Sequence, residues 1–147
     1  MPTKRKLHVF LCHASQDKSI VRDLKKKLLD ENWIEPWLDE DRLLPGQDWN
    51  MEIEKAVESS DVVLVCVSSI SVAKEGYVQK ELRQVLDIAL EKLDGAIFII
   101  PIRLDDCELP RKLKDKQALD YFPPTNQASA FDKLKTSLKT RKDGLRI

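Results

Sequence analysis

An unbroken apolar run, VVLVCV at residues 62–67, constrains the fold of this chain more than any other feature. A strand without polar residues is typical of a parallel sheet, because the helices that connect parallel strands cover both of its faces. Apolar runs at residues 7–12, 33–38, 96–102 and 118–122 predict further strands. Segments with helical apolar spacing lie between these runs, so we expect strands and helices to alternate along the chain.

Polar residues mark where the predicted helices begin and end. Asp17 and Asp48 each precede an amphipathic segment, where a carboxylate can accept hydrogen bonds from the first backbone amides of a helix. Asn32 is a candidate left-handed stop for the first helix. The strongest helical pattern covers residues 77–93, and a last helix is expected to fade into the charged tail at residues 139–147.

This alternation predicts an α/β fold: a flavodoxin-like three-layer sandwich, with a parallel sheet of four to five strands and helices on both faces. The 147 residues form one domain, residues 1–147, whose core spans about residues 7–140. Ligands of such folds bind at the carboxyl ends of the strands. The loops at those ends are residues 13–16, 39–47, 68–76 and 103–110.

Charge and cysteine content exclude several classes of protein. The 25 basic residues balance 25 acidic ones, so nothing attracts the chain to nucleic acid or to a membrane surface. Its apolar runs are too short to span a bilayer. Cys12, Cys66 and Cys107 form no CxxC pair, and only two histidines are present, which indicates a reduced, cytoplasmic protein without a metal site.

Motifs of other proteins with this type of sheet are missing. Neither GxGxxG nor GxxxxGK[ST] follows the first strand, so no glycine-built phosphate site is expected. A phospho-receiver needs acidic residues at the ends of the first and third strands, where this chain has Cys12-His13 and Val67-Ser68. No GxSxG elbow of a hydrolase occurs either.

Glu81 is the candidate catalytic residue. At about 100° per residue, it falls a quarter-turn from the centre of its helix's apolar face, on the boundary with solvent. Tyr77 lies one turn earlier on the same side, so a ring and a carboxylate share one flank near the start of the helix. The aromatic ring could hold a ring-bearing ligand, and the carboxylate would then lie beside its reacting carbon. The pattern alone leaves open that Glu81 is an ordinary boundary carboxylate, solvated or bonded to Gln84.

Four segments resemble the motifs of one family, the TIR (Toll/interleukin-1 receptor) domains, in the family's order. Residues 9–17 (VFLCHASQD) are similar to its opening strand and loop, and residues 37–46 (WLDEDRLLPG) to its second motif and BB loop. Residues 60–68 (SDVVLVCVS) resemble its third strand, and residues 77–82 (YVQKEL) its aromatic-x-x-x-Glu helix. The resemblance covers about residues 7–140, and the BB loop looks closest to the bacterial branch.

The resemblance implies an NAD+ nucleosidase that cleaves the nicotinamide–ribose bond, with NAD+ as substrate and no cofactor. Glu81 matches the family's catalytic glutamate, and Tyr77 stands where tryptophan is usual. The product is ADP-ribose or a cyclic isomer. The resemblance also implies activation by self-association, a role in immunity such as antiphage defence, and a sensor or other domains outside this chain. The alternative is a non-catalytic adaptor that acts through TIR–TIR contacts.

Further residues are candidates for the same site. Substrate contacts are expected from the loop after the first strand, from the helix after the BB loop and from the end of the third strand: His13, Ala14, Ser15, Trp49 and Ser68. Each has an alternative, since Trp49 also fits the core and Ser15 can support the start of a helix. By analogy with relatives, the BB loop contacts a neighbouring subunit through Leu43, Leu44, Pro45 and Gly46. The acidic residues 105, 106 and 108 are interpreted as a solvated loop.

Overall fold

A computed structural model describes residues 5–13, 15–38, 45–46, 48–70, 80–91 and 98–147. At positions 15, 37–38, 49–50, 80–82 and 84 it describes the course of the chain and not the side chains. The predicted residues Ala14, Leu43, Leu44 and Tyr77 therefore lie outside the described residues.

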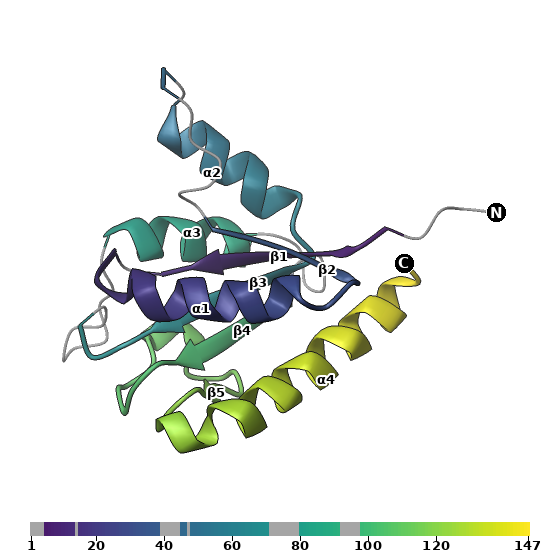
Figure 1. The fold of residues 1–147 in the computed structure, drawn as a ribbon. Helices are drawn as coiled ribbons and strands as arrows, with labels where there is room; N and C mark the ends of the chain where they lie inside the picture. Colours follow the sequence, from purple (N-terminus) through teal and green to yellow (C-terminus); the bar gives the residue numbers. More distant parts are fainter. Residues whose placement is uncertain (1–4, 14, 39–44, 47, 71–79, 92–97) are drawn as a thin grey trace.

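Five strands form one sheet in the described part of the chain (Figure 1). They are β1 (Leu7–Cys12), β2 (Ile34–Leu38), β3 (Val62–Val67), β4 (Phe98–Arg103) and β5 (Leu119–Asp120). Their spatial order is β2-β1-β3-β4-β5, and every neighbouring pair is parallel. This order confirms the predicted flavodoxin-like sheet. Pro36 lies in the edge strand β2, where a missing N–H does least harm.

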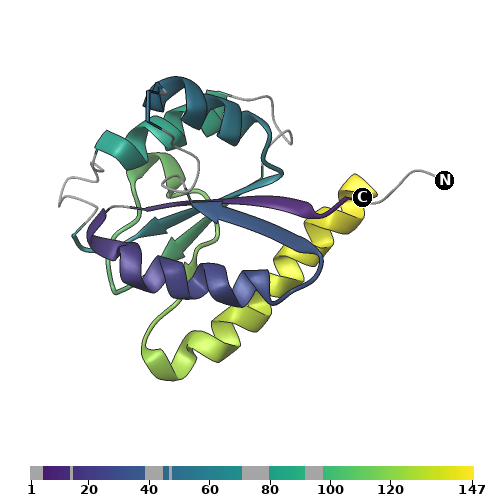
Figure 2. The same ribbon diagram turned by 45° about the horizontal axis from the view of Figure 1, so that its top comes forward.

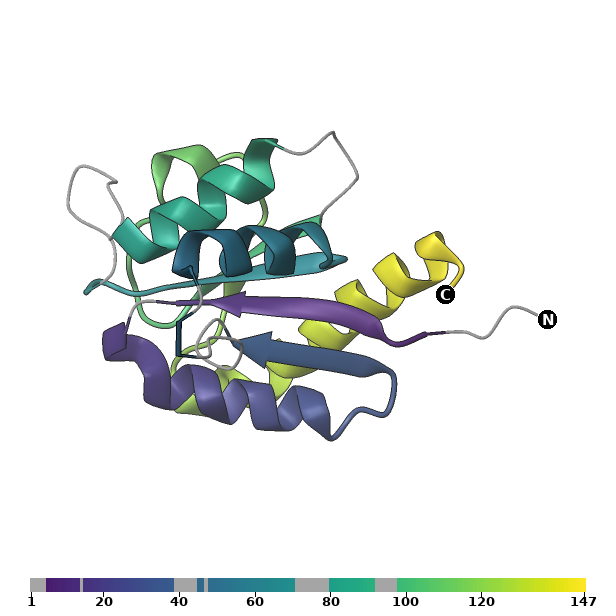
Figure 3. The ribbon, with the colours of Figure 1, turned by 90° about the horizontal axis from the view of Figure 1, so that it is seen from above.

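Helices cover both faces of the sheet, as Figures 2 and 3 show. The α-helices of the described residues are α1 (Lys18–Leu29), α2 (Trp49–Glu58), α3 (Lys80–Glu91) and α4 (Gln127–Leu145). Short 3-10 turns occupy Ser15–Asp17, Arg111–Leu113 and Pro124–Asn126. Helices α1 and α4 lie on one face, and α2 and α3 on the other.

Strand residues alternate between two hydrophobic cores. Within β3, Leu64 and Cys66 pack toward α1 and α4, whereas Val63 and Val65 pack toward α2 and α3. Every residue of β3 is buried. The unbroken apolar run therefore follows from its central place in the sheet, where both faces are covered.

Three expectations about helix ends need correction. Helix α4 does not fade at residue 139 but continues to Leu145, because Leu138 packs in the core and Lys142 is buried on the same face. Asp17 precedes α1 without a side-chain capping bond. Helix α1 ends before Asn32, and Asp30 after it has right-handed backbone angles. Asp48 does cap α2, since its carboxylate accepts a hydrogen bond from the Met51 amide at 3.3 Å.

The β4–β5 pairing is short for a local reason. β5 pairs only with Ile102 and Arg103 of β4. The amides of Phe98 and Leu104 donate toward β3, so the alternate residue Pro101 directs its nitrogen toward the β5 side. Proline has no N–H to donate there. Among the described residues, no strand pairs with the first part of β4 on this side, which we call its open edge.

Candidate active site at the carboxyl edge of the sheet

The carboxyl ends of β1, β3 and β4 lie at one edge of the sheet, because the three strands are parallel neighbours. His13 follows β1, Ser68 follows β3 and Asp105 lies in the loop after β4. His13 and Ser68 are both buried, at 5% and 3% exposure. Two of the predicted substrate residues are thus brought to the expected edge, together with Asp105 of the 103–110 loop that was also predicted there.

Asp17 connects the β1 loop to the end of β3. It is buried, and its Oδ2 accepts a hydrogen bond of 2.8 Å from the Ser68 hydroxyl. The Ser68 oxygen in turn accepts a bond from the Ile70 amide at 3.3 Å. Asp17 was expected to cap α1, and its carboxylate binds β3's end instead. Ser68 therefore has a structural partner, and its contact with substrate stays a prediction.

Asp105 holds the same segment from the β4 side. The Ser69 amide donates to both of its carboxylate oxygens, at 2.9 and 3.1 Å, and the Ser69 hydroxyl donates at 2.8 Å. The interpretation of residues 105–108 as a solvated loop is therefore incomplete, since it fits Asp106 but not Asp105. Two carboxylates from different loops fix residues 68–70, the first residues after β3.

Burial dominates the electrostatics of this edge. It raises the pKa of Asp17; the nearby charge of Asp105 adds to the rise, while the Ser68 bond and His13 oppose it. Burial together with Asp17 also raises the pKa of the Cys66 thiol well above its usual range. Burial raises the pKa of Cys107 to about 11, with Asp105 contributing. Both thiols are protonated near neutral pH, so neither is a ready nucleophile.

Glu81 is the second residue of α3 as described. Helix α3 connects the carboxyl end of β3 to the amino end of the parallel strand β4, so its first turn lies at the carboxyl edge (Figure 1). The same argument brings the start of α2, with Trp49, to this edge. The side chains of Glu81, Trp49 and Ser15 lie outside the described part, as does all of Tyr77. Their roles in binding or catalysis therefore stay predictions.

Pro45 and Gly46, the described residues of the predicted BB loop, are exposed. Gly46 has a φ of +87°, in the left-handed region that side chains disfavour. Proline followed by a glycine at positive φ is the signature of a tight type II turn. The turn predicted from Pro45-Gly46 is thus present.

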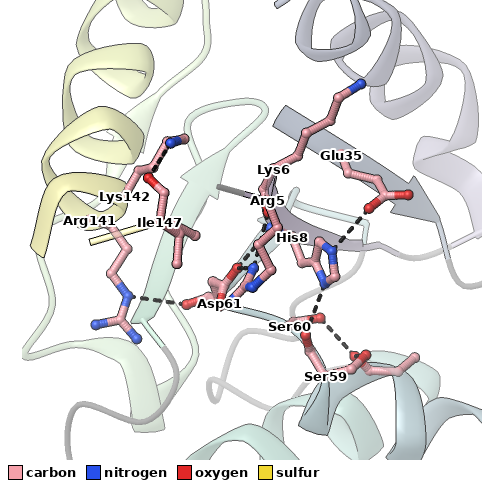
Figure 4. Close-up of polar contacts among 11 residues, drawn as sticks. Arg5, Lys6, His8, Glu35, Ser59, Ser60, Asp61, Arg141, Lys142 and Ile147 are labelled. Carbon is pink, nitrogen blue, oxygen red and sulfur yellow. Dashed lines mark hydrogen bonds and ion pairs between the residues drawn. The ribbon is translucent and has the colours of Figure 1, made fainter. Parts of the chain in front are cut away.

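A second polar cluster lies at the opposite, amino edge of the sheet (Figure 4). Arg5 forms two hydrogen bonds with Asp61, at 2.7 and 2.8 Å, and the His8 amide donates to the same carboxylate at 2.9 Å. Arg141 of α4 donates to the Asp61 carbonyl at 3.3 Å. Burial alone favours a higher pKa for Asp61, but the bonds from Arg5 and His8 outweigh it and lower the pKa. This cluster joins the start of β1 to α4 and was not predicted.

Neither a metal centre nor a membrane helix is found among the described residues. No group of three or more histidine, cysteine or acidic side chains is arranged there to hold a metal ion. None of the helices described is long and apolar enough to cross a membrane.

Comparison with known proteins identifies the family. The TIR domain family matches residues 9–135, and this chain belongs to it. A curated relative is the 2′ cyclic ADP-D-ribose synthase BtTIR of Bacteroides thetaiotaomicron, which is 32% identical over 125 residues. That match covers 81% of this chain but only 42% of the relative.

Solved structures agree on the fold. The TIR domain of the Toll-related receptor TRR-2 from Hydra magnipapillata superposes with a TM-score of 0.70 at 21% identity, covering 89% of this chain and 97% of that one. A prokaryotic SEFIR domain superposes with a TM-score of 0.69 at 24% identity, covering 90% and 92%. At these identities the likeness concerns the fold alone.

Proposed function

We propose that this TIR domain cleaves NAD+ at the nicotinamide–ribose bond, with Glu81 as the catalytic carboxylate. The observation that carries the proposal is the 32% identity to a 2′ cyclic ADP-D-ribose synthase. Further support comes from the position of Glu81 in the first described turn of α3, at the edge where ligands bind in this type of sheet.

One carboxylate suffices for this chemistry. Glycosidases generally need a second acid to protonate a poor leaving group. In NAD+ the bond between ribose and the positively charged nicotinamide ring breaks with its electron pair going to the ring nitrogen, so nicotinamide leaves as a neutral molecule. Glu81 would stabilise the positive charge that develops on the ribose. Capture of that carbon by water, with loss of a proton, gives ADP-ribose, and capture by a group of the same molecule gives a cyclic isomer.

The hydrogen bonds at the carboxyl edge hold the beginning of the β3–α3 connection in place, which supports the proposal. Asp17 and Asp105 hold residues 68–70, which begin the connection from β3 to α3. A site that stabilises a developing charge works best when its groups are already in place before the reaction. The relative's name favours a cyclic product here, and we expect the reaction to occur in the cytoplasm, as part of an immune response, without a cofactor.

Nicotinamide release tests the assignment. Purified wild type, Glu81→Ala and Glu81→Gln are each incubated with NAD+ at high protein concentration, and free nicotinamide is measured by chromatography. We expect both substitutions to lower the rate by a hundredfold or more, on the order of losing a key stabilising group. Glu91→Gln is a matched control, because Glu91 is an exposed carboxylate at the other end of α3. Equal rates in all four proteins would remove Glu81 from the mechanism.

Self-association is the second part of the proposal. We infer that the BB loop, including Pro45 and Gly46, contacts a neighbouring subunit and that this contact activates the enzyme. Release of nicotinamide per protein molecule should then rise with protein concentration or when the protein is clustered on beads. Pro45→Ala should reduce both that rise and the sedimentation of oligomers, whereas unchanged behaviour would refute the role of this loop.

A non-catalytic adaptor is the alternative function. Membership of the TIR family is compatible with it, because a fold by itself does not fix a function. Absence of nicotinamide release at every concentration and in the clustered form, together with intact TIR–TIR association, would select the adaptor.

A further inference from the structure

A groove of about 590 Å³ lies between the open edge of β4, the β5 strand and α4. Its volume falls within the roughly 300–1,000 Å³ of typical small-molecule sites. The groove runs along one side of β4, from Phe98 at the amino end of the strand to Leu119 of β5, which pairs with Ile102. None of the described residues that line the groove is a predicted catalytic or substrate-binding residue or a member of the hydrogen-bond network around Asp17.

The floor of the groove is apolar. Ile100 of β4 and Leu134 of α4 are buried there, and Leu119 of β5 is half-buried. Phe98, the first residue of β4, is 43% exposed, so part of its ring is accessible from the groove. The groove thus offers a flat ring and aliphatic walls to a ligand.

The rim of the groove is basic. Lys133, Ser137 and Arg141 recur every four residues, so they form one stripe along α4 that spans about 12 Å. Lys116 adds a third cation from the β5 side. None of the described residues that line the groove is acidic.

Neighbouring contacts hold parts of this rim in place. Arg141 donates through Nε to the Asp61 carbonyl, and its guanidinium carbon lies 5.9 Å from the centre of the Phe98 ring. Near the other end of the stripe, the charge of Lys133 acts on Asp120, whose carboxylate already binds Arg103 at 2.7 Å. Lys116 and Lys133 are exposed residues of the groove lining.

We propose that this groove binds a small organic anion with a flat apolar part, such as an aromatic carboxylate or sulfonate or a nucleoside phosphate. The ring would lie against Phe98 and Leu119, and the anionic group would pair with Lys116, Lys133 or Arg141. A ligand with an apolar ring and a negative charge matches both the apolar floor and the basic rim. A neutral ring matches only the floor, and a cationic ligand is repelled by the rim.

Fluorescence titration with 8-anilinonaphthalene-1-sulfonate tests the proposal on the whole chain. We expect saturable binding to wild type that the double variant Lys116→Glu/Lys133→Glu weakens about tenfold or more, since two attractive charges become repulsive. The matched control is Lys26→Glu/Lys55→Glu, which makes the same charge change at exposed sites on α1 and α2 and should leave binding unchanged. The uncharged N-phenyl-1-naphthylamine should bind wild type more weakly and respond little to either double variant.

Two further measurements locate the probe. Backbone amide NMR shifts on titration should concentrate at Ile100, Leu119 and Ser137 and spare Ser68, and Ser137→Trp should abolish them by filling the groove. Glu81→Ala should bind the probe as wild type does, so failure of the proposed NAD+ chemistry leaves this test intact. Circular dichroism checks that each variant is folded. The proposal is wrong if the Lys116/Lys133 variant binds normally or if the shifts appear elsewhere.

Discussion

The Ser68 hydroxyl lies 2.8 Å from Oδ2 of Asp17, a residue 51 positions earlier in the chain. This bond joins the carboxyl end of β3 to the beginning of α1, and both residues are buried. On the other side of the same segment, the Ser69 amide and hydroxyl donate to Asp105. The residues that leave β3 toward the Glu81 helix are therefore held by carboxylates from two neighbouring loops.

Ser68→Ala is expected to lower the free energy of unfolding by about 1–3 kcal/mol, because it leaves a buried carboxylate without one of its donors. Ser69→Ala should cost less than about 1 kcal/mol, since the amide of residue 69 still binds Asp105 and the site is exposed. Urea unfolding of both variants beside wild type gives the comparison. Equal losses would contradict the expectation that the buried Ser68–Asp17 bond contributes more to stability than the Ser69 hydroxyl.

Asp17 predicts an unusual pH dependence of stability. Its pKa is raised above the ordinary 3.8, so between that value and the raised one the folded state binds more protons than the unfolded state. The contribution of Asp17 to stability should therefore fall as pH rises above about 4. Urea unfolding from pH 3.5 to 7 should show wild type losing stability relative to Asp17→Asn across this window. The raised pKa would be refuted if the free energy of unfolding of wild type, minus that of Asp17→Asn, stayed constant or increased with pH.

For Asp61 we expect the opposite change of stability with pH. Its pKa is lowered below 3.8, so its stabilising contribution is present above that pH and is lost as the pH falls through the lowered value. At pH 7, Asp61→Asn should cost about 2 kcal/mol, because Arg5 and the His8 amide lose a charged acceptor. The deficit should shrink in acid. Asp106→Asn serves as the control, since that side chain is 88% exposed and should have little effect at any pH.

Gly46 and Gly144 predict opposite responses to alanine. Gly46→Ala should destabilise the chain by about 1 kcal/mol, because its φ of +87° strains any residue with a Cβ. Gly144 lies in the last turn of α4, and apart from its chain neighbours and the backbone of its own helix no atom lies within 4 Å of the point that an alanine Cβ would occupy, so Gly144→Ala should be neutral or stabilising by less than about 1 kcal/mol. Thermal unfolding measures both. A stabilising Gly46→Ala would mean that the loop adopts another conformation in solution.

The pattern of apolar residues predicted much of the fold. β1 and β3 begin and end at the expected residues, and the parallel, flavodoxin-like order is confirmed. These features depend on local spacing and on the need to bury both faces of a central strand, which a sequence displays directly. The end of α4 was missed because Lys142 looks solvated in the sequence, although the structure buries it on the core side of the helix.

The sequence by itself determined the order of strands and helices, the Pro45-Gly46 turn, and the edge of the sheet where Glu81 and Ser68 belong. Only the tertiary structure decided how the polar side chains pair: Asp17 binds Ser68 rather than its own helix, Asp105 binds Ser69, and Arg5 meets Asp61. Apolar burial acts through a short repeating pattern that neighbouring residues reveal. A hydrogen bond between residues 51 or 56 positions apart depends on which loops the folded sheet brings together, and no local pattern carries that information.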